Sequence, residues 1–507
     1  MARGQLRVLH ALDVARTQLY HFTAIAIAGM GFFTAAYDFF SISLVAGLLG
    51  HVYYEDKLPR GVSAAVHSIA LCGAVPGQLV FGWLGDKMGR KRIYGVTLLL
   101  MVACSLASGL SFSKREGRNV VIVLCFFRFW LGVSIGGDYP LSATIMAEYA
   151  NKRRRGAFIA AVFAMQGFGN VAAGIVGMVA SSSFANSNKS NADFVWRIVL
   201  MFGAIPAALT YYWRMKMPET ARYTALVTKN AEKVALDMSA VLKMDIDPEE
   251  DTVNQLATQD QYGLLSAEFL RCHGTHLLGT TVCWLTLDIT FYSLNLFMDE
   301  IFVKVGLLPD PNNMKNPFER MIKITQLHTV ITLCGTLPGY FFTVAFVDRI
   351  GRVKIQLLGF TMMSVFILCL AIPYHYWTEQ RNKYGFAVMY GMTFFFANFG
   401  PNTTTFIIPA EIFPARLRST CHGISGAFGK IGAIIGVFGF RYTEDQYIRF
   451  VLFALVGSNL VGLLFTLLLT ESKQKSLEEI TGEMVEQQPQ DDAAAVAAAE
   501  YIHTVHL

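Results

Sequence analysis

The stretch GWLGDKMGRKR, from Gly82 to Arg92, has a counterpart in the second half of the chain, VAFVDRIGRVK, from Val344 to Lys354. When the two are aligned, Asp86 falls on Asp348. Two further pairs of similar stretches occur in the same order: AEYANKRRRG (147–156) with AEIFPARLRS (410–419), and PETARY (218–223) with TESKQKSLEEI (470–480). Three matches in one order indicate an internal duplication, so the two halves of the chain are expected to have equivalent structures.

The composition predicts a membrane protein. Of the 507 residues, 53% are hydrophobic and only 16% are charged, whereas a soluble domain carries about a quarter charged residues. Apolar runs of roughly 20 residues recur, which is the length that crosses about 30 Å of hydrocarbon. The sequence therefore predicts an all-α membrane protein with twelve spans in two halves of six. We expect the spans at residues 20–50, 61–85, 92–112, 119–148, 156–180, 194–215, 268–303, 320–347, 354–374, 384–411, 417–440 and 446–470.

The distribution of basic residues predicts the orientation. The loops after the second, fourth, eighth and tenth spans are rich in Lys and Arg, and the positive-inside rule places them in the cytoplasm, together with both termini. A smaller basic cluster, Lys114, Arg115 and Arg118, opposes this assignment but is outnumbered. We expect an N-terminal half at 1–215, a cytoplasmic central segment at 216–267, a C-terminal half at 268–475 and a cytoplasmic tail at 476–507.

Several classes of function lack support in the sequence. The net charge is only +5, and the basic residues flank apolar runs instead of forming one patch, so no nucleic-acid partner is expected. The 8 cysteines are scattered without a CxxC pair, and no metal-ligand cluster, nucleotide loop or nucleophile–base pair is evident. We therefore expect neither an enzyme nor a cofactor or metal. Homo-oligomerisation stays open.

The duplicated loops carry charges that could act as a gate. Carboxylates near helix N-termini and arginines of neighbouring loops could form ion pairs that hold one conformation and break in the other. The alternative is that these charges only fix the topology. The residues concerned are Asp86, Arg90, Glu148 and Arg154 in the first half, and Asp348, Arg352, Glu411 and Arg416 in the second.

Ionisable residues also occur inside the predicted spans, where they are costly and mark functional sites by default. They are Asp38, Arg128 and Asp138 in the first half and Asp288 and Lys430 in the second.

Trp284, Asp288 and Tyr292 are spaced by four residues, so they share one stripe of a helix. An indole N–H, a carboxyl group and a phenol hydroxyl would meet along this stripe. Other polar residues in spans lie beside Pro or Gly, where the backbone often lines a cavity. These are Asp138 and Tyr139 in GGDYP, Gln166 in AMQGFGN and Asn402 in FGPNTTTF; for Gln166 and Asn402, simple pairing with a neighbouring helix is an equally good explanation.

Two long stretches resemble a known family. GGDYPLSATIMAEYANKRRRGAFIAAVFAMQGFGN (136–170) and FGPNTTTFIIPAEIFPARLRSTCHGISGAFGKIGA (399–433) are similar to the plant and fungal high-affinity phosphate:proton symporters of the major facilitator superfamily. The similarity runs from about Gln5 to Ile480. It implies the twelve-helix major-facilitator fold in the plasma membrane, with a substrate site between the halves.

The resemblance also implies roles for individual residues. Phosphate would be bound by Tyr139, Gln166, Trp284, Asp288, Tyr292 and Asn402. Asp38 and Asp138, together with Asp288, would serve proton coupling, and Arg128 and Lys430 would be charged partners near the path.

The chemistry agrees with this assignment. Hydroxyl, indole and amide donors suit a tetrahedral oxyanion. An ionised Asp288 would repel phosphate, whereas a protonated Asp288 could donate a hydrogen bond and later expel the anion by losing its proton. Each negative charge moved inward against an inside-negative potential costs about 2.3 kcal/mol per 100 mV, so entry of monovalent phosphate needs more than one proton if the potential is to drive it.

The sequence departs from the family at one acidic position. FFTAAYDFFS (32–41) has Ala35 where family members typically have an aspartate, as FFTDAYD. We expect phosphate binding to survive and proton-driven uptake to be reduced. Ala35 is explained equally well by natural variation and by an engineered substitution, and the sequence does not distinguish these two origins.

Two other functions remain as alternatives. PETARY and the basic loops fit another major-facilitator carrier, of sugars or organic ions, equally well. A phosphate receptor that signals without much transport is the second alternative, although the chain offers no obvious signalling domain.

Overall fold

The structure, a computed structural model, describes residues 2–4, 9, 13, 19–54, 58–112, 118–184, 192–235, 262–309, 316–379, 381–442, 447–483 and 485–487. Most of the predicted central segment (236–261) and the end of the tail (488–507) therefore lie outside the described residues, and the predicted domain boundaries remain predictions. Eleven helices in the described part are long and apolar enough to cross a membrane.

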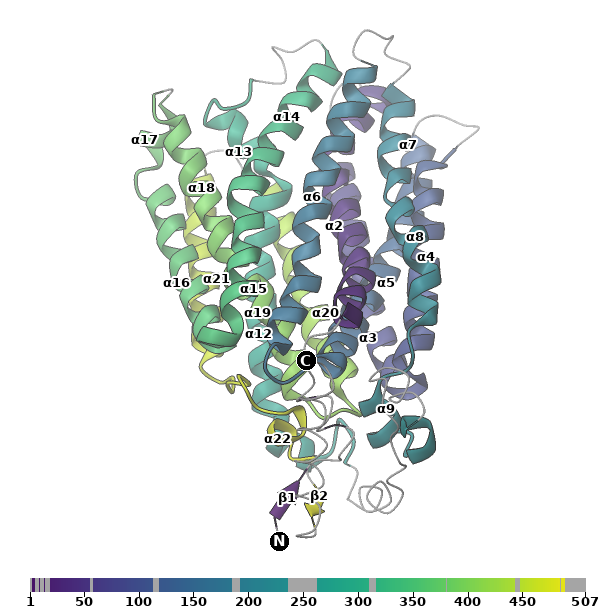
Figure 1. Cartoon of the computed structure of the whole chain (residues 1–507). Helices are drawn as coiled ribbons and strands as arrows, with labels where there is room; N and C mark the ends of the chain where they lie inside the picture. Colours follow the sequence, from purple (N-terminus) through teal and green to yellow (C-terminus); the bar gives the residue numbers. More distant parts are fainter. Residues whose placement is uncertain are drawn as a thin grey trace.

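The first half is an up-and-down bundle (Figure 1). Its spanning helices are α2 (Leu19–Tyr53), α3 (Arg60–Met88), α4 (Arg90–Gly109), α5 (Arg118–Tyr149), α6 (Arg155–Ser183) and the pair α7 (Ala192–Phe202) and α8 (Ala204–Lys216), which follow one another as the sixth span. The short helix α9 (Ala221–Leu226) follows α8.

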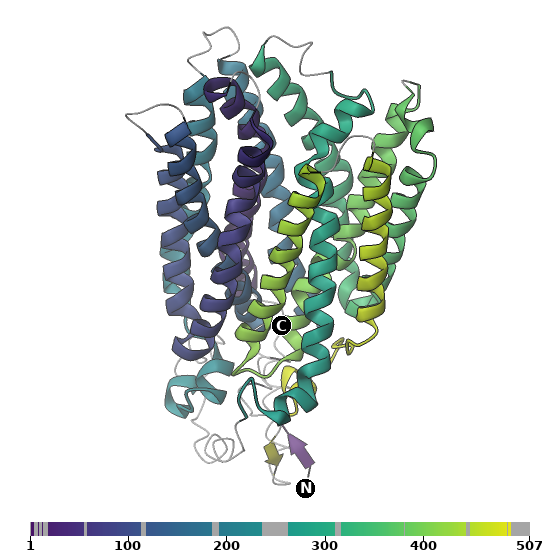
Figure 2. The same ribbon diagram turned by 180° about the vertical axis from the view of Figure 1, so that it is seen from behind.

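The second half repeats this arrangement beside the first (Figure 2). Its helices are α12 (Ala267–Leu296), α13 (Met298–Lys304), α14 (Pro317–Ile331), the π-helical turn η3 (Thr332–Thr336), α15 (Leu337–Ile350), α16 (Arg352–Ala371), α17 (Tyr374–Thr378), α18 (Lys383–Asn398), α19 (Pro401–Ile412), α20 (Arg418–Arg441) and α21 (Ile448–Thr466). Helix α22 (Leu477–Thr481) and an antiparallel pair of three-residue strands, β1 (Ala2–Gly4) and β2 (Val485–Gln487), complete the described elements. The predicted all-α fold of two halves is confirmed.

The predicted tenth span is not one helix. It consists of α18 and α19, separated at Phe399 and Gly400. Gly400 packs against Gly359 of α16 so closely that a Cβ on Gly400 would lie 2.6 Å from the Cα of Gly359. Pro401 then begins α19, in the first-turn position where a missing N–H costs nothing. The break places Asn402 in the first turn of a new helix in the middle of the bundle.

The internal duplication extends further into the helices than the loops suggest. Pro76-Gly77-Gln78 in α3 corresponds without a gap to Pro338-Gly339-Tyr340 in α15. In each half, two glycines pack directly onto backbone carbonyls of the same half, which small residues allow; three of them lie in α3 and α15, and Gly335 lies in η3, just before α15. The glycine–carbonyl contacts are Gly73 with Phe129 and Gly77 with Val133 in the first half, and Gly335 with Gly391 and Gly339 with Phe395 in the second.

The bundle has one end at which the duplicated loops, α9, α22 and the β1–β2 pair gather (Figure 1). We call it the loop end. The two halves meet along α3 and α5 against α20 on one side, and along α6 against α14 and α15 on the other. These contacts between the halves position both candidate sites.

Candidate functional site

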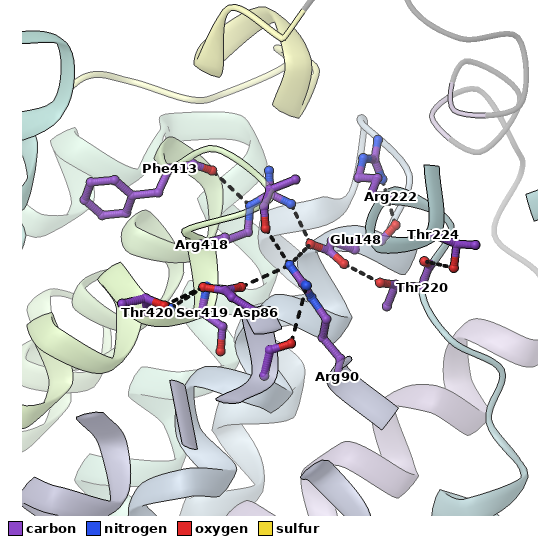
Figure 3. Close-up of polar contacts among 12 residues, drawn as sticks. Asp86, Arg90, Glu148, Thr220, Arg222, Thr224, Phe413, Arg418, Ser419 and Thr420 are labelled. Atoms are coloured by element: carbon purple, nitrogen blue, oxygen red, sulfur yellow. Dashed lines mark hydrogen bonds and ion pairs between the residues drawn. The ribbon is translucent and has the colours of Figure 1, made fainter. Parts of the chain in front are cut away.

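A network of buried charges joins the two halves at the loop end. Glu148, at the end of α5, lies 2.8 Å from Arg418 of α20 and 3.3 Å from Arg90 of α4 (Figure 3). The same Arg90 guanidinium donates to the Ala415 carbonyl of the second half at 2.5 Å. All three charged side chains are fully buried, and parting of the halves would take the buried Arg418 guanidinium away from Glu148, which is costly in the interior.

Asp86 joins the halves by capping a helix of the other half. Its carboxylate accepts the backbone N–H of Ser419 at 3.2 Å, and the backbone N–H and hydroxyl of Thr420, each at 2.7 Å. These donors belong to the first turn of α20, where the helix dipole favours a negative charge.

The equivalent residues of the second half form the same kind of network. Asp348 accepts the N–H groups of Gly156, at 3.2 Å, and Ala157, at 2.8 Å, in the first turn of α6. Glu411 lies 2.8 Å from Arg352 and 3.0 Å from Arg155. Each half therefore contributes one aspartate that caps a helix of the other half and one glutamate that pairs with an arginine of the other half.

Six of the eight predicted loop residues take part in these networks; Arg154 and Arg416 do not. Arg154 is exposed, and Arg416 lies over the Tyr262 ring at 4.1 Å. In place of Arg154 and Arg416, the arginines that pair with a carboxylate of the other half are Arg155 and Arg418, the first residues of α6 and α20. Their equivalent places in the two duplicated loops were the signal that would have identified them.

A further ion-pair cluster was not predicted. Arg222 of α9 lies 2.8 Å from Asp13 and 2.7 Å from Glu478 of α22, and all three are buried. Burial disfavours the charged guanidinium, but the two carboxylates outweigh this and raise the pKa of Arg222. The contact ties the end of the first half to the segments near both chain termini.

The second candidate site lies in the middle of the bundle, where Lys430 of α20 meets α12. The Lys430 ammonium donates to the Asp288 carboxylate at 3.0 Å and to the Tyr292 hydroxyl at 2.9 Å. It also lies 5.2 Å from the centre of the Tyr139 ring, which belongs to the first half. The buried acid of the predicted stripe is therefore neutralised by a buried base.

A chain of hydrogen bonds crosses between the halves beside this pair. The Gln166 amide donates to the Tyr139 hydroxyl at 2.8 Å, and the Tyr340 hydroxyl donates to the Gln166 oxygen at 3.5 Å. The Asn402 amide donates to the Tyr340 hydroxyl at 3.1 Å. Only the Tyr340–Gln166 bond crosses between the halves. Asn402 bonds to Tyr340 and to Asn398, at 2.7 Å, which both belong to its own half.

Trp284 completes the cluster. Its ring covers Gly429 of α20, where a Cβ would lie 2.4 Å from the ring, and its edge faces His422 at 5.4 Å between ring centres. The Phe406 ring contacts both Trp284, at 6.4 Å, and Tyr139, at 6.2 Å. We use the name central cluster for the six predicted phosphate ligands with Lys430 and Tyr340: Tyr139, Gln166, Trp284, Asp288, Tyr292, Tyr340, Asn402 and Lys430.

Tyr340 is a member of this cluster that the sequence did not predict. Its position was readable, because it stands in the second half where Gln78 stands in the first. The central cluster is buried, and aromatic rings cover it. Phe163 stacks on Phe406 at 4.6 Å between ring centres, and Phe40 stacks on Tyr292 at 6.4 Å.

Asp38 does not belong to the central cluster but lies inside the first half. The Arg128 guanidinium donates to its backbone carbonyl at 2.8 Å, and a Cβ on Gly203 would lie 2.7 Å from its carboxylate. The neighbouring Ser105 hydroxyl donates to the Leu200 carbonyl instead. In the described part of the chain, neither carboxylate oxygen of the fully buried Asp38 has a hydrogen-bond partner.

Asp138 also lies inside the first half, paired with Arg214 of α8 at 2.5 Å. Ser142 donates to the same carboxylate at 3.4 Å. Arg214 was not predicted as a partner, because it stands in the last turn of its span and reaches back into the bundle.

Helix α2 carries Asp38 and also contacts Asp138. Gly31 packs against Asp138, where a Cβ would lie 2.1 Å from the carboxylate, and Asp38 faces Arg128 two turns later. Gly31, Ala35 and Asp38 are spaced by four and three residues, so they share one face of α2. Ala35, which is 1% exposed, therefore lies between the two buried acids.

Comparison with known proteins agrees with this architecture. Residues 23–483 match the family described as Sugar (and other) transporter. The chain is 74% identical over 504 residues to "Putative inorganic phosphate transporter 1-13" of Oryza sativa subsp. japonica, covering 99% of each. It is 58% identical over 512 residues to "Low affinity inorganic phosphate transporter 1" of Petunia hybrida, covering 94% of this chain and 96% of the relative.

The fold is that of a solved sugar carrier. The proton:xylose symporter XylE of the major facilitator superfamily, bound to 6-bromo-6-deoxy-D-glucose, superposes with a TM-score of 0.71 at 17% identity. The superposition covers 91% of this chain and 98% of XylE. At this identity the likeness concerns the fold alone.

Proposed function

This chain belongs to the inorganic phosphate transporters within the sugar (and other) transporter family, and from that premise we propose that it imports inorganic phosphate together with protons across the plasma membrane by alternating access. The observation that carries the proposal is the central cluster, in which hydroxyl and amide donors from both halves meet beside the Lys430–Asp288 pair. Binding between the halves is how carriers of this build expose one site alternately to each side.

The central cluster suits an oxyanion better than a sugar. It combines a buried ammonium group, phenol hydroxyls, amides and an indole, all of which can donate to phosphate oxygens. In the present arrangement Tyr139, Gln166, Tyr340 and Asn402 hydrogen-bond to one another. An entering phosphate would take over these donors, so little polar surface would have to be newly desolvated.

The Lys430–Asp288 pair supplies a mechanism for linking phosphate to a proton. Phosphate competes with Asp288 for the Lys430 ammonium, and Asp288 then becomes an uncompensated buried carboxylate that takes up a proton. The protonated carboxyl group can donate to the anion. Loss of the proton restores the ion pair with Lys430 and expels phosphate.

Further protons would be carried by Asp38 and Asp138 in the first half. Each acid is buried beside an arginine, Arg128 and Arg214 respectively, so a change in its protonation changes the charge of a buried pair. More than one proton per monovalent phosphate is required if the membrane potential is to drive uptake. Ala35 lies between the two acids where the family has a third, and we propose that coupling is reduced for that reason.

The loop-end networks would form the cytoplasmic gate. The positive-inside rule, applied to the basic loops, supports a cytoplasmic position of the loop end. The Asp86 and Asp348 caps and the Glu148–Arg418 and Glu411–Arg155 pairs join the halves there, so they must break for phosphate to leave.

Substrate identity can be tested in proteoliposomes. We expect uptake of radiolabelled phosphate under an inward proton gradient, competition by unlabelled phosphate, and little competition by sulfate or glucose. Effective competition by glucose, with phosphate itself not taken up, would make the chain a sugar carrier and refute the proposal.

A further inference from the structure

Gln78 of α3 is a polar side chain that the central cluster and the loop-end networks do not use. It is fully buried, and neither its amide nitrogen nor its amide oxygen has a hydrogen-bond partner in the described part of the chain. A buried amide without partners raises the free energy of the state that buries it. A methionine of similar length would fill the same space without this penalty.

The Gln78 amide lies on the contact between the halves. A Cβ on Gly426 of α20 would be 2.9 Å from both the amide nitrogen and the amide oxygen, and a Cβ on Gly423 would be 2.3 Å from the Gln78 carbonyl. One turn further along α3, Gly82 packs on the Ser419 carbonyl. We call this contact the α3–α20 seam; it runs from the Gln78 amide to the loop end.

The seam begins next to the central cluster. Gly426 precedes Lys430 by one helical turn on α20, and Trp284 covers Gly429 between them. Phosphate that leaves the central cluster towards the loop end must therefore pass where the seam is now closed.

The equivalent residue of the other half has the partners that Gln78 lacks. Tyr340 occupies the same position in α15 and hydrogen-bonds to Gln166 across the contact between α15 and the first half, and to Asn402 within its own half. The two pseudo-equivalent contacts between the halves therefore differ. One is closed by satisfied hydrogen bonds, and the other is closed over an unsatisfied amide.

We propose that Gln78 is a positioning residue of the transport cycle, whose unsatisfied amide destabilises the closed α3–α20 seam and so promotes opening at the loop end. When the halves part there, water reaches the amide and supplies the missing hydrogen bonds. The closed form has no such compensation, so the amide shifts the equilibrium towards opening without contacting phosphate. This inference rests on the proposed function only in assuming that the halves alternate, not in what they carry.

The test compares two buried glutamines. Gln78→Met removes the unsatisfied amide, whereas Gln356→Met removes one that donates to Thr466 and accepts from Thr404 inside the second half. Both side chains are fully buried, which makes the second variant a matched control. Ser419→Cys in the seam serves as the reporter, and its alkylation by a maleimide is measured in inside-out vesicles without phosphate. The same chain with Ser419 retained gives the background alkylation of the other cysteines.

We expect Gln78→Met to slow alkylation of the reporter about tenfold, equivalent to about 1.4 kcal/mol. It should also raise the melting temperature of the detergent-solubilised protein and lower the maximal rate of phosphate uptake about tenfold, with the KM for external phosphate within twofold. Gln356→Met should lower the melting temperature and leave the alkylation rate within twofold.

Unchanged or faster alkylation in Gln78→Met would overturn the inference, as would an equal effect of Gln356→Met. Because alkylation is measured without phosphate, these results do not depend on what the protein carries. A failure of the unmodified chain to take up phosphate would instead overturn the proposed function.

Discussion

Lys430 and Asp288 form a buried ion pair, 3.0 Å apart, between two helices of the second half. Desolvating two charges is costly, and apolar residues of similar size would often stabilise a fold as well or better. The pair is therefore better explained by function than by stability. It holds a positive charge next to the donors that would bind phosphate, and it holds a carboxylate that can accept a proton when that positive charge is drawn away.

Lys430→Met should lower phosphate uptake at least tenfold. It removes the charge that attracts the anion and leaves the Asp288 carboxylate buried without a partner, which typically costs about 3–5 kcal/mol. Uptake and the melting temperature of the solubilised protein are the measurements. The double variant Lys430→Met with Asp288→Asn should recover the melting temperature but not the uptake; full recovery of uptake would exclude a role for the pair in transport.

Ala35→Asp should increase proton-driven phosphate uptake several-fold. The new carboxyl group would lie between Asp138 and Asp38 on one face of α2 and could exchange protons with either. The measurement is initial uptake at several external pH values, with the KM for phosphate expected to stay within about threefold. Ala36→Asp, one residue away on a different face of α2, is the control. Identical uptake by the Ala35→Asp chain and the unmodified chain at every pH would contradict this account.

Glu411→Gln should favour opening at the loop end. The carboxylate is shared by Arg352 and Arg155. The substitution leaves Arg155 without this counter-charge and leaves Arg352 with Asp348 as its carboxylate partner. We expect a cysteine at the first turn of α6 to be alkylated faster by at least tenfold. Glu319→Gln, which breaks the exposed Glu319–Lys323 pair, should have no effect, because exposed pairs contribute only about 0–1 kcal/mol. An unchanged alkylation rate in the Glu411→Gln variant would contradict a gating role and would mean that these charges only fix the topology.

Glu483 should make stability depend on pH. Burial raises the pKa of this carboxyl group, with Arg418 opposing the rise. A raised pKa means that the native state holds the proton more tightly than the unfolded state, so stability falls as the pH rises from the ordinary carboxyl range through the raised value. Glu483→Gln keeps the acceptor for the Ala415 N–H but cannot ionise. It should therefore weaken the dependence of the melting temperature on pH above the ordinary carboxyl range. A pH profile as steep as that of the unmodified chain would contradict this assignment.

The spans and the duplication were predictable from the sequence because hydropathy and short repeated motifs depend on local residues. The Trp284, Asp288 and Tyr292 stripe was predictable for the same reason, since helical spacing fixes which residues share a face. The position of Asp38 was not predictable. Helix α2 is apolar on all sides, so its pattern does not show which face meets the other half.

Side-chain contacts between helices that are distant in the sequence could not be predicted either. Arg214 and Asp138 lie on different helices of the first half, and Tyr340 and Asn402 lie on different helices of the second half. Spacing along one helix says nothing about such pairs. The duplication offered partial help, because Gln78 and Tyr340, and likewise Arg155 and Arg418, occupy equivalent positions.

The proposed function requires coupled entry of phosphate and protons. It is tested most directly by phosphate uptake into proteoliposomes in which the pH gradient and the membrane potential are set separately, for this chain and its Ala35→Asp variant. We expect an inward proton gradient and an inside-negative potential each to stimulate uptake, more strongly in the Ala35→Asp variant. Phosphate accumulation in neither protein, or accumulation that neither gradient alters, would contradict the account.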